Sequence, residues 1–142
     1  MNLRILIVSQ DKEKIVFYKS LFIDLGQQPS SAAGAFEALR VFINYNKYGA
    51  PFDLVFTDYI LPGMNGINLA RRLLAIYPDV NLVLFPQACF YETGLYRDYA
   101  AFGGFMQETP DDSFLEYRNI IDCTLHKKAV LKKTFAGNCS TT

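Results

Sequence analysis

The chain has 142 residues, of which 51% are hydrophobic and 20% charged, and its 14 basic and 14 acidic residues give a net charge of zero. This length and composition predict one globular domain with an apolar core. The neutral balance argues against nucleic acid as the main partner, because phosphate binding needs a basic surface.

Targeting and redox features of the sequence indicate the cytoplasm. No apolar stretch reaches the ~20 residues of a membrane span, and no basic segment with an apolar run behind it marks a signal peptide. We therefore expect no membrane partner. Cys89, Cys123 and Cys139 are scattered and have no metal-type spacing, which is typical of reduced cytosolic thiols.

Short apolar runs alternate with helix-like segments along the chain. Strands are predicted at 3–8, 27–33, 53–57, 81–85 and 104–107, with 27–33 at an edge. Helices are predicted at 12–25, 36–45, 67–76, 91–102 and 111–128. This alternation predicts an α/β fold, a doubly wound five-stranded parallel sheet with helices on both faces. In such a sheet, functional groups gather at the carboxyl ends of the strands.

The domain is predicted to span residues 1–128. The extension 129–142 has a small, polar end and is expected to be partly disordered. No effector domain follows the predicted domain, so the module either works alone or was excised from a longer protein.

The stretch 53–66, DLVFTDYILPGMNG, is the most informative segment. A buried strand ends on Asp58, and a loop with proline and glycine follows at once. An aspartate before a loop often only caps the turn. Here the whole segment resembles the phosphoacceptor region of response-regulator receiver domains, in which D-x-x-x-P-x-x-x-G matches Asp58, Pro62 and Gly66. The resemblance extends from Leu3 to about Leu125.

The resemblance implies a flavodoxin-like, CheY-like fold with strand order 2-1-3-4-5, in which Asp58 is the phosphoacceptor. In this family an acidic pair after the first strand helps to hold Mg²⁺, and those positions match the neutral Ser9 and Gln10. Asp11 follows one place later. The implied metal ligands are thus Asp11, Asp58 and the backbone carbonyl of Ile60, a weak or absent site for an ion that prefers charged oxygens.

The family's switch positions also depart from the pattern. Its fourth-strand hydroxyl position falls near Pro86, and no residue of 85–88 carries a hydroxyl. Its fifth-strand lysine matches Glu108, a charge reversal at a position where one ion pair is worth about 4 kcal/mol. Its rotating aromatic corresponds to Phe105. The changes at the acidic pair, the hydroxyl position and the lysine position all oppose phosphorylation, although Asp11, Asp58 and Glu108 together suggest a minor alternative, a three-carboxylate cation site.

The region of the fourth predicted helix, fifth strand and fifth helix is rich in aromatic residues. Most of them are expected to fill the core. Tyr91, Tyr96 and Tyr99 are expected to contribute to a binding surface, for a homodimer or for another signalling protein such as a histidine kinase, phosphotransfer protein or effector.

The sequence therefore predicts an atypical receiver module of two-component or phosphorelay signalling. The main interpretation is a pseudo-receiver, which works through protein contacts with impaired phosphorylation of Asp58. The alternative is a phosphorylation-competent receiver. Neither is an enzyme beyond an autocatalytic phosphoacceptor. A hydrolase on the same scaffold is a distant third hypothesis, because the chain has neither a G-x-S-x-G elbow nor a phosphate-binding loop.

Overall fold

A computed structural model describes residues 2–85, 106–108 and 117–129, with the side chains of 106–108 excepted. The strands are β1 (Arg4–Val8), β2 (Gln28–Ala32), β3 (Leu54–Thr57), β4 (Asn81–Leu84) and β5 (Met106–Glu108). The helices are α1 (Lys12–Asp24), α2 (Ala35–Lys47), α3 (Gly66–Ile76) and a helix over 117–129. All strand pairs are parallel, in the order β2-β1-β3-β4-β5, which confirms the predicted fold class.

The predicted boundaries differ from the observed ones by a few residues at most. Strand β5 runs to Glu108, so this residue ends the strand instead of following it. Helix α1 ends at Asp24, one residue before its predicted end, and Gly26 just beyond it has a φ of +80°, which suits glycine. The predicted helix over 91–102, residues 111–116 of the predicted 111–128 helix, and 130–142 of the extension lie outside the described residues.

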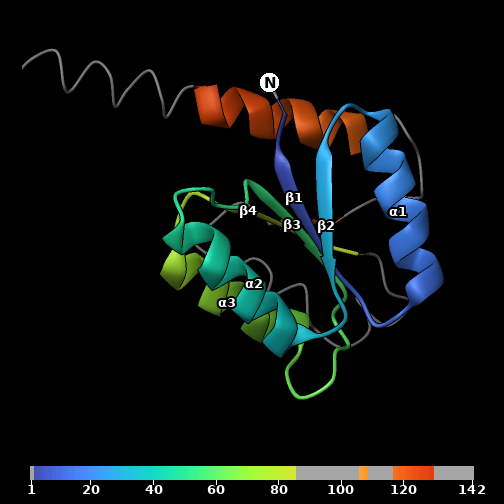
Figure 1. Cartoon of the computed structure of the whole chain (residues 1–142), viewed down its shortest axis with the longest axis vertical. Coiled ribbons are helices and arrows are strands. Elements are labelled where there is room, and N and C mark those ends of the chain that lie inside the picture. Colours follow the sequence, from blue (N-terminus) through green and yellow to red (C-terminus); the bar gives the residue numbers. More distant parts are fainter. Residues whose placement is uncertain (1, 86–105, 109–116, 130–142) are drawn as a thin grey trace, which may run out of the picture.

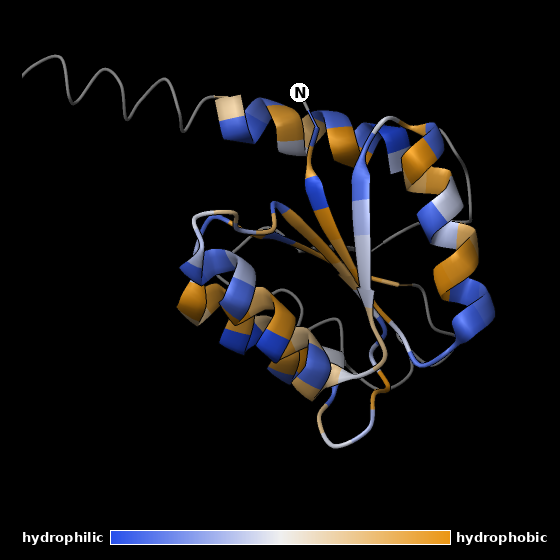
Figure 2. Cartoon of the chain, in the orientation of Figure 1, coloured by the Kyte–Doolittle hydropathy of each residue, from blue (hydrophilic) through white to orange (hydrophobic). Residues whose placement is uncertain are grey.

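The central strands form because apolar, often β-branched side chains fill both of their faces. Every residue of β3 and β4 is buried, as are the last four of β1. Strand β2 is more polar (QPSSA), and Figure 2 shows it pale beside the apolar centre of the sheet. An edge strand tolerates Pro29, which has no N–H to donate to a ladder.

Two helical layers cover the sheet, one on each face (Figure 1). Because side chains alternate along a strand, Leu6 and Val8 of β1 pack in the core beneath α2 and α3. Ile5 and Ile7 point the other way, into the core beneath α1 and the 117–129 helix. Within the described residues, no helix is long and apolar enough to cross a membrane.

An aromatic cluster forms the centre of the second core. Two rings of α1 contact rings of the sheet. The ring centroids of Phe22 and Phe56 lie 4.8 Å apart, and those of Tyr18 and Phe85 lie 4.6 Å apart. The Tyr117 hydroxyl donates to the Tyr18 hydroxyl at 3.0 Å. Rings at these separations attract each other beyond the area that they bury. The cluster therefore joins α1, the sheet and the 117–129 helix into one unit.

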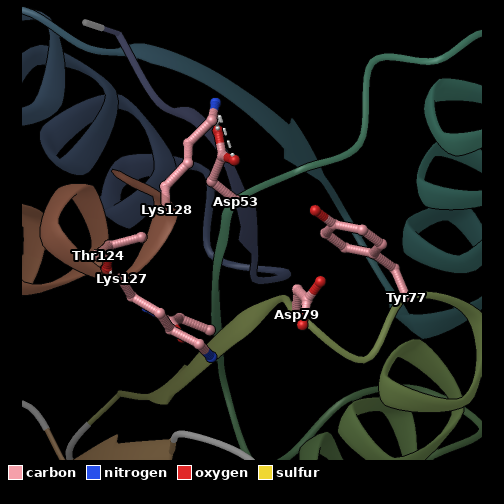
Figure 3. Close-up of a pocket in the computed structure, with 7 residues that line it drawn as sticks. Asp53, Tyr77, Asp79, Thr124, Lys127 and Lys128 are labelled. Carbon is pink, nitrogen blue, oxygen red and sulfur yellow. Dashed lines mark hydrogen bonds and ion pairs between the residues drawn. The ribbon is translucent and has the colours of Figure 1, made fainter. Parts of the chain in front are cut away.

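A polar layer at the amino ends of β3 and β4 holds the other end of the 117–129 helix (Figure 3). Asp53 accepts a hydrogen bond from the backbone N–H of Arg4 at 2.9 Å and forms an ion pair with Lys128 at 3.1 Å. Asn81 donates to Thr124 at 2.9 Å and accepts from Lys127 at 2.7 Å. The recess between these groups measures about 20 Å³, room for one water.

Tyr77 also lines this recess, and its pKa is raised above the ordinary value by burial and by the nearby charges of Asp79 and Asp53. Because the recess is so small and its buried polar groups are paired, we interpret it as an anchor for the helix.

This anchor predicts that Asp53→Ala lowers the free energy of unfolding by about 2 kcal/mol, because the Arg4 N–H and the Lys128 ammonium lose a buried acceptor. The exposed neighbour Asp79→Ala is the matched control, with an expected change within about 0.5 kcal/mol. Urea unfolding monitored by circular dichroism measures both. Equal effects of the two substitutions would contradict the anchoring role.

Candidate functional site

The carboxyl ends of the three central strands lie side by side. Val8 pairs with Thr57, and Thr57 pairs with Leu84. The residues that follow these strand ends are therefore neighbours at one edge of the sheet: Ser9, Asp58 and Phe85. Backbone hydrogen bonds extend the ladder to them, from Asp58 N–H to the Val8 carbonyl at 3.0 Å and from Phe85 N–H to the Thr57 carbonyl at 2.9 Å.

Asp58 is buried, with 7% of its surface exposed, and both of its carboxylate oxygens have partners. The Ser9 hydroxyl donates to Oδ2 at 2.5 Å. The Lys14 ammonium forms an ion pair with Oδ1. Such charge-assisted contacts are short and stronger than neutral hydrogen bonds. The chain's own side chains thus satisfy the charge that burial of this carboxylate would otherwise leave uncompensated.

The local sequence brings Lys14 to this place. Asp11 is the N-cap of α1, and its Oδ1 accepts from the backbone N–H groups of Glu13 at 3.0 Å and Lys14 at 3.3 Å. The Ser9 hydroxyl in turn accepts from Asp11 N–H at 3.1 Å. The first turn of α1 therefore starts directly at the sheet edge. The Lys14 ammonium lies 4.2 Å from the centroid of the Phe85 ring, within cation–π distance.

The loop after Asp58 depends on a glycine for a steric reason. Gly66 N–H donates to the Tyr59 carbonyl at 2.7 Å, and this closes the loop onto the strand end. A Cβ on Gly66 would lie 2.2 Å from the backbone oxygen of Asp58. Asn65 then caps α3 by accepting from Asn68 N–H at 2.8 Å. Only glycine allows this approach, which explains the last position of the motif.

The sequence-predicted site residues have different locations. Asp58 and Ser9 meet at the sheet edge, whereas Gln10 is exposed and the side chain of Ile60 is 59% exposed. The Asp11 carboxylate, considered above as a metal ligand, caps α1 through Oδ1. Glu108 ends β5 in register with Leu84, and only its backbone is described. Pro86, Phe105 and the three tyrosines Tyr91, Tyr96 and Tyr99 lie outside the described residues.

Sequence reasoning missed Lys14. The lysine expected at the acceptor was sought only along the fifth strand, where Glu108 stands, whereas the structure supplies an ammonium from α1. A usable indication was present: Lys14 occupies the first turn of a helix that starts directly beyond a strand end. Among the described side chains, no group of three or more His, Cys, Asp or Glu residues is arranged to hold a metal ion.

No family model matches the chain. The virulence sensor protein BvgS of Bordetella bronchiseptica is 33% identical over 75 residues, which are 53% of this chain and only 6% of that protein. A response regulator receiver domain protein of Clostridium thermocellum superimposes with a TM-score of 0.77 at 18% identity, over 91% of this chain and 98% of the other. The response regulator TrrA of Thermotoga maritima, solved in complex with Mg²⁺-BeF, gives 0.67 at 18% identity, over 87% and 99%.

These structural likenesses cover nearly the whole of the compared proteins and show that the chain has the fold of response-regulator receiver (CheY-like) domains. The partial match to a sensor protein agrees with this resemblance. The sequence-based recognition of that fold, made from the Asp58 loop, is thereby confirmed.

The steric role of Gly66 predicts that Gly66→Ala destabilises the protein by about 2 kcal/mol or more, because the new methyl group collides with the Asp58 carbonyl and the loop must shift. Gly34→Ala is the matched control, since its Cβ would find nothing nearer than 4.0 Å. Differential scanning fluorimetry compares the two variants with wild type. An unchanged melting temperature for Gly66→Ala would contradict the close approach.

Proposed function

We propose that this chain is a receiver module of two-component signalling that acts through protein contacts, with Asp58 withheld from phosphoryl transfer. The observation that carries the proposal is the engagement of both Asp58 carboxylate oxygens by Ser9 and Lys14. The receiver fold and the acceptor loop support the signalling class, and the occupied carboxylate supports the pseudo-receiver form within it.

The chemistry of phosphoryl transfer explains why this engagement matters. An aspartate nucleophile must present a carboxylate oxygen to phosphorus, so that the new P–O bond forms as the bond to the donor's leaving group breaks. Oδ1 here faces an ammonium, and Oδ2 accepts from a hydroxyl at 2.5 Å. A phosphoryl donor must displace one of these contacts before it reaches the nucleophile.

The divalent cation implied by the fold family fits this site poorly. TrrA, a protein of the same fold, was solved in complex with Mg²⁺-BeF. The resemblance of the sequence to receiver domains would make Asp11, Asp58 and the Ile60 carbonyl the ligands here. Magnesium needs near-octahedral oxygen coordination, usually with one or two carboxylates. In this chain Ser9 and Gln10 are neutral, Asp11 caps a helix, and an ammonium contacts Asp58. We therefore propose function without a resident metal.

The second candidate is a phosphorylation-competent receiver with Asp58 as acceptor. The observation that favours it is the same ammonium, because a positive charge beside the acceptor also neutralises charge on a transferred phosphoryl group. Under either candidate function, the chain catalyses at most the transfer of a phosphoryl group to its own Asp58.

The proposed partners are signalling proteins: a histidine kinase, a phosphotransfer protein or an effector, with a homodimer as a further possibility. The chain spans 6% of the sensor protein that it matches, so a larger protein's activity is not transferred to it. Among the aromatic residues of that region, Tyr117 is fully buried and belongs to the core, whereas Tyr91, Tyr96 and Tyr99, predicted to face a partner, lie outside the described residues. The exposed free thiol of Cys123 suits action in the reducing cytoplasm.

The test is incubation with Mg²⁺ and acetyl phosphate, followed by intact-mass spectrometry, with a phosphorylatable receiver treated in parallel. We expect no phosphate adduct on the wild-type chain under conditions that modify the reference receiver, because Lys14 and Ser9 occupy the nucleophile. Asp58→Asn is the site control. An adduct that forms on wild type and is lost in Asp58→Asn would reject the pseudo-receiver in favour of the second candidate.

A further inference from the structure

The positive charge that contacts Asp58 is a side chain of the same protein, the ammonium of Lys14. Lys14 comes from α1, 44 residues before Asp58 in the sequence, and the side-chain exposures of the pair are 23% and 10%. An ion pair so largely removed from water is weakly screened by salt and has few alternative partners. The carboxylate and the ammonium therefore form a lasting contact, unlike a surface pair whose members are mostly hydrated.

Further contacts order the residues around this ion pair. The Asp11 cap orders the backbone at Lys14, and the Phe85 ring lies beneath the ammonium at 4.2 Å. Ser9 links the two halves of the site, because its hydroxyl donates to Asp58 and accepts from Asp11 N–H. The position of Lys14 is thus set by the cap of its helix, by the Phe85 ring and by the Asp58 carboxylate.

We propose that Lys14 is the resident cation of the Asp58 site and that it excludes divalent metal ions from the carboxylate. This inference rests on the proposed function, for which it supplies the cause. Metal binding through Oδ1 requires the ammonium to withdraw, and a withdrawn ammonium that stays nearby still repels a second cation. The charge at residue 14 therefore determines whether the Asp58 carboxylate is paired with an ammonium or is available to bind a metal ion.

Removal of that charge should open the site. Lys14→Met keeps an unbranched side chain, one atom shorter, but removes the ammonium from both Oδ1 and the Phe85 ring. We expect Lys14→Met to bind Mn²⁺ at least about tenfold more tightly than wild type, measured by the electron paramagnetic resonance signal of free Mn²⁺. The double variant Lys14→Met/Asp58→Asn should lose this gain. Lys12→Met removes an exposed charge from the same helical turn and should leave Mn²⁺ affinity unchanged.

The acetyl phosphate assay on the same variants separates this inference from the proposed function. An unmodified wild type together with tighter Mn²⁺ binding by Lys14→Met supports both. An unmodified wild type without a gain in Mn²⁺ affinity overturns the role of Lys14 and leaves the pseudo-receiver standing. A wild type that is modified more slowly than Lys14→Met supports exclusion by Lys14 but overturns the pseudo-receiver. A wild type that is modified faster than Lys14→Met overturns both, because Lys14 then assists the transfer.

A second measurement covers the case in which Lys14→Met fails to fold. Brief acetylation with an N-hydroxysuccinimide ester, read by peptide mass spectrometry, reports the access of each amine in the folded protein. Wild-type Lys14 should react several-fold more slowly than Lys12, and Asp58→Asn should abolish that protection for Lys14 alone. Equal rates for Lys14 in wild type and Asp58→Asn would show that Asp58 does not hold the Lys14 ammonium in solution, and this would overturn the exclusion of metal.

Discussion

The parallel register of β1, β3 and β4 is the constraint on which the arrangement of the molecule depends. It aligns Val8, Thr57 and Leu84, so that the residues after them meet at one edge of the sheet. Alternation along the same strands sends Leu6 and Ile7 to opposite cores, and a slip of one residue would exchange those faces. The register thus decides both the burial of the apolar side chains and the position of Asp58.

The amino ends and the carboxyl ends of the central strands form two opposite edges of the sheet with different roles, although an aspartate lies next to a lysine at each. At the amino edge, Asp53 and Lys128 belong to a polar layer whose recess holds no more than a water, and that layer secures the 117–129 helix. At the carboxyl edge, Asp58 and Lys14 form an ion pair beyond the strand ends, where open parallel sheets bind their ligands. The aromatic cluster connects the edges, because Phe85 contacts both the Lys14 ammonium and Tyr18. Tyr18 in turn accepts a hydrogen bond from Tyr117, in the helix that carries Lys128.

The Asp58 site can be understood as a problem of charge balance. A buried carboxylate needs a cation or several donors, and a metal ion, a lysine or hydroxyl groups can meet that need. With Ser9 and Gln10 in place of acidic residues, the local negative charge that would attract a divalent ion is low. One ammonium and one hydroxyl are then sufficient. On our proposal the chain keeps a stable receiver fold, and its signalling depends on its surface.

The sequence alone determined the strands, the parallel α/β architecture and the place of Asp58, because apolar runs and the Pro-Gly loop are local patterns. It also identified Gly66, although only the 2.2 Å approach to the Asp58 carbonyl explains why that residue must be glycine. The tertiary structure decided which side chains meet Asp58. Lys14 lies 44 residues away in the sequence, and its reach depends on how α1 packs against the sheet. Asp11, which the family resemblance suggested as a metal ligand, caps that helix, because it stands directly before α1 and its Oδ1 accepts from the backbone N–H groups of Glu13 and Lys14.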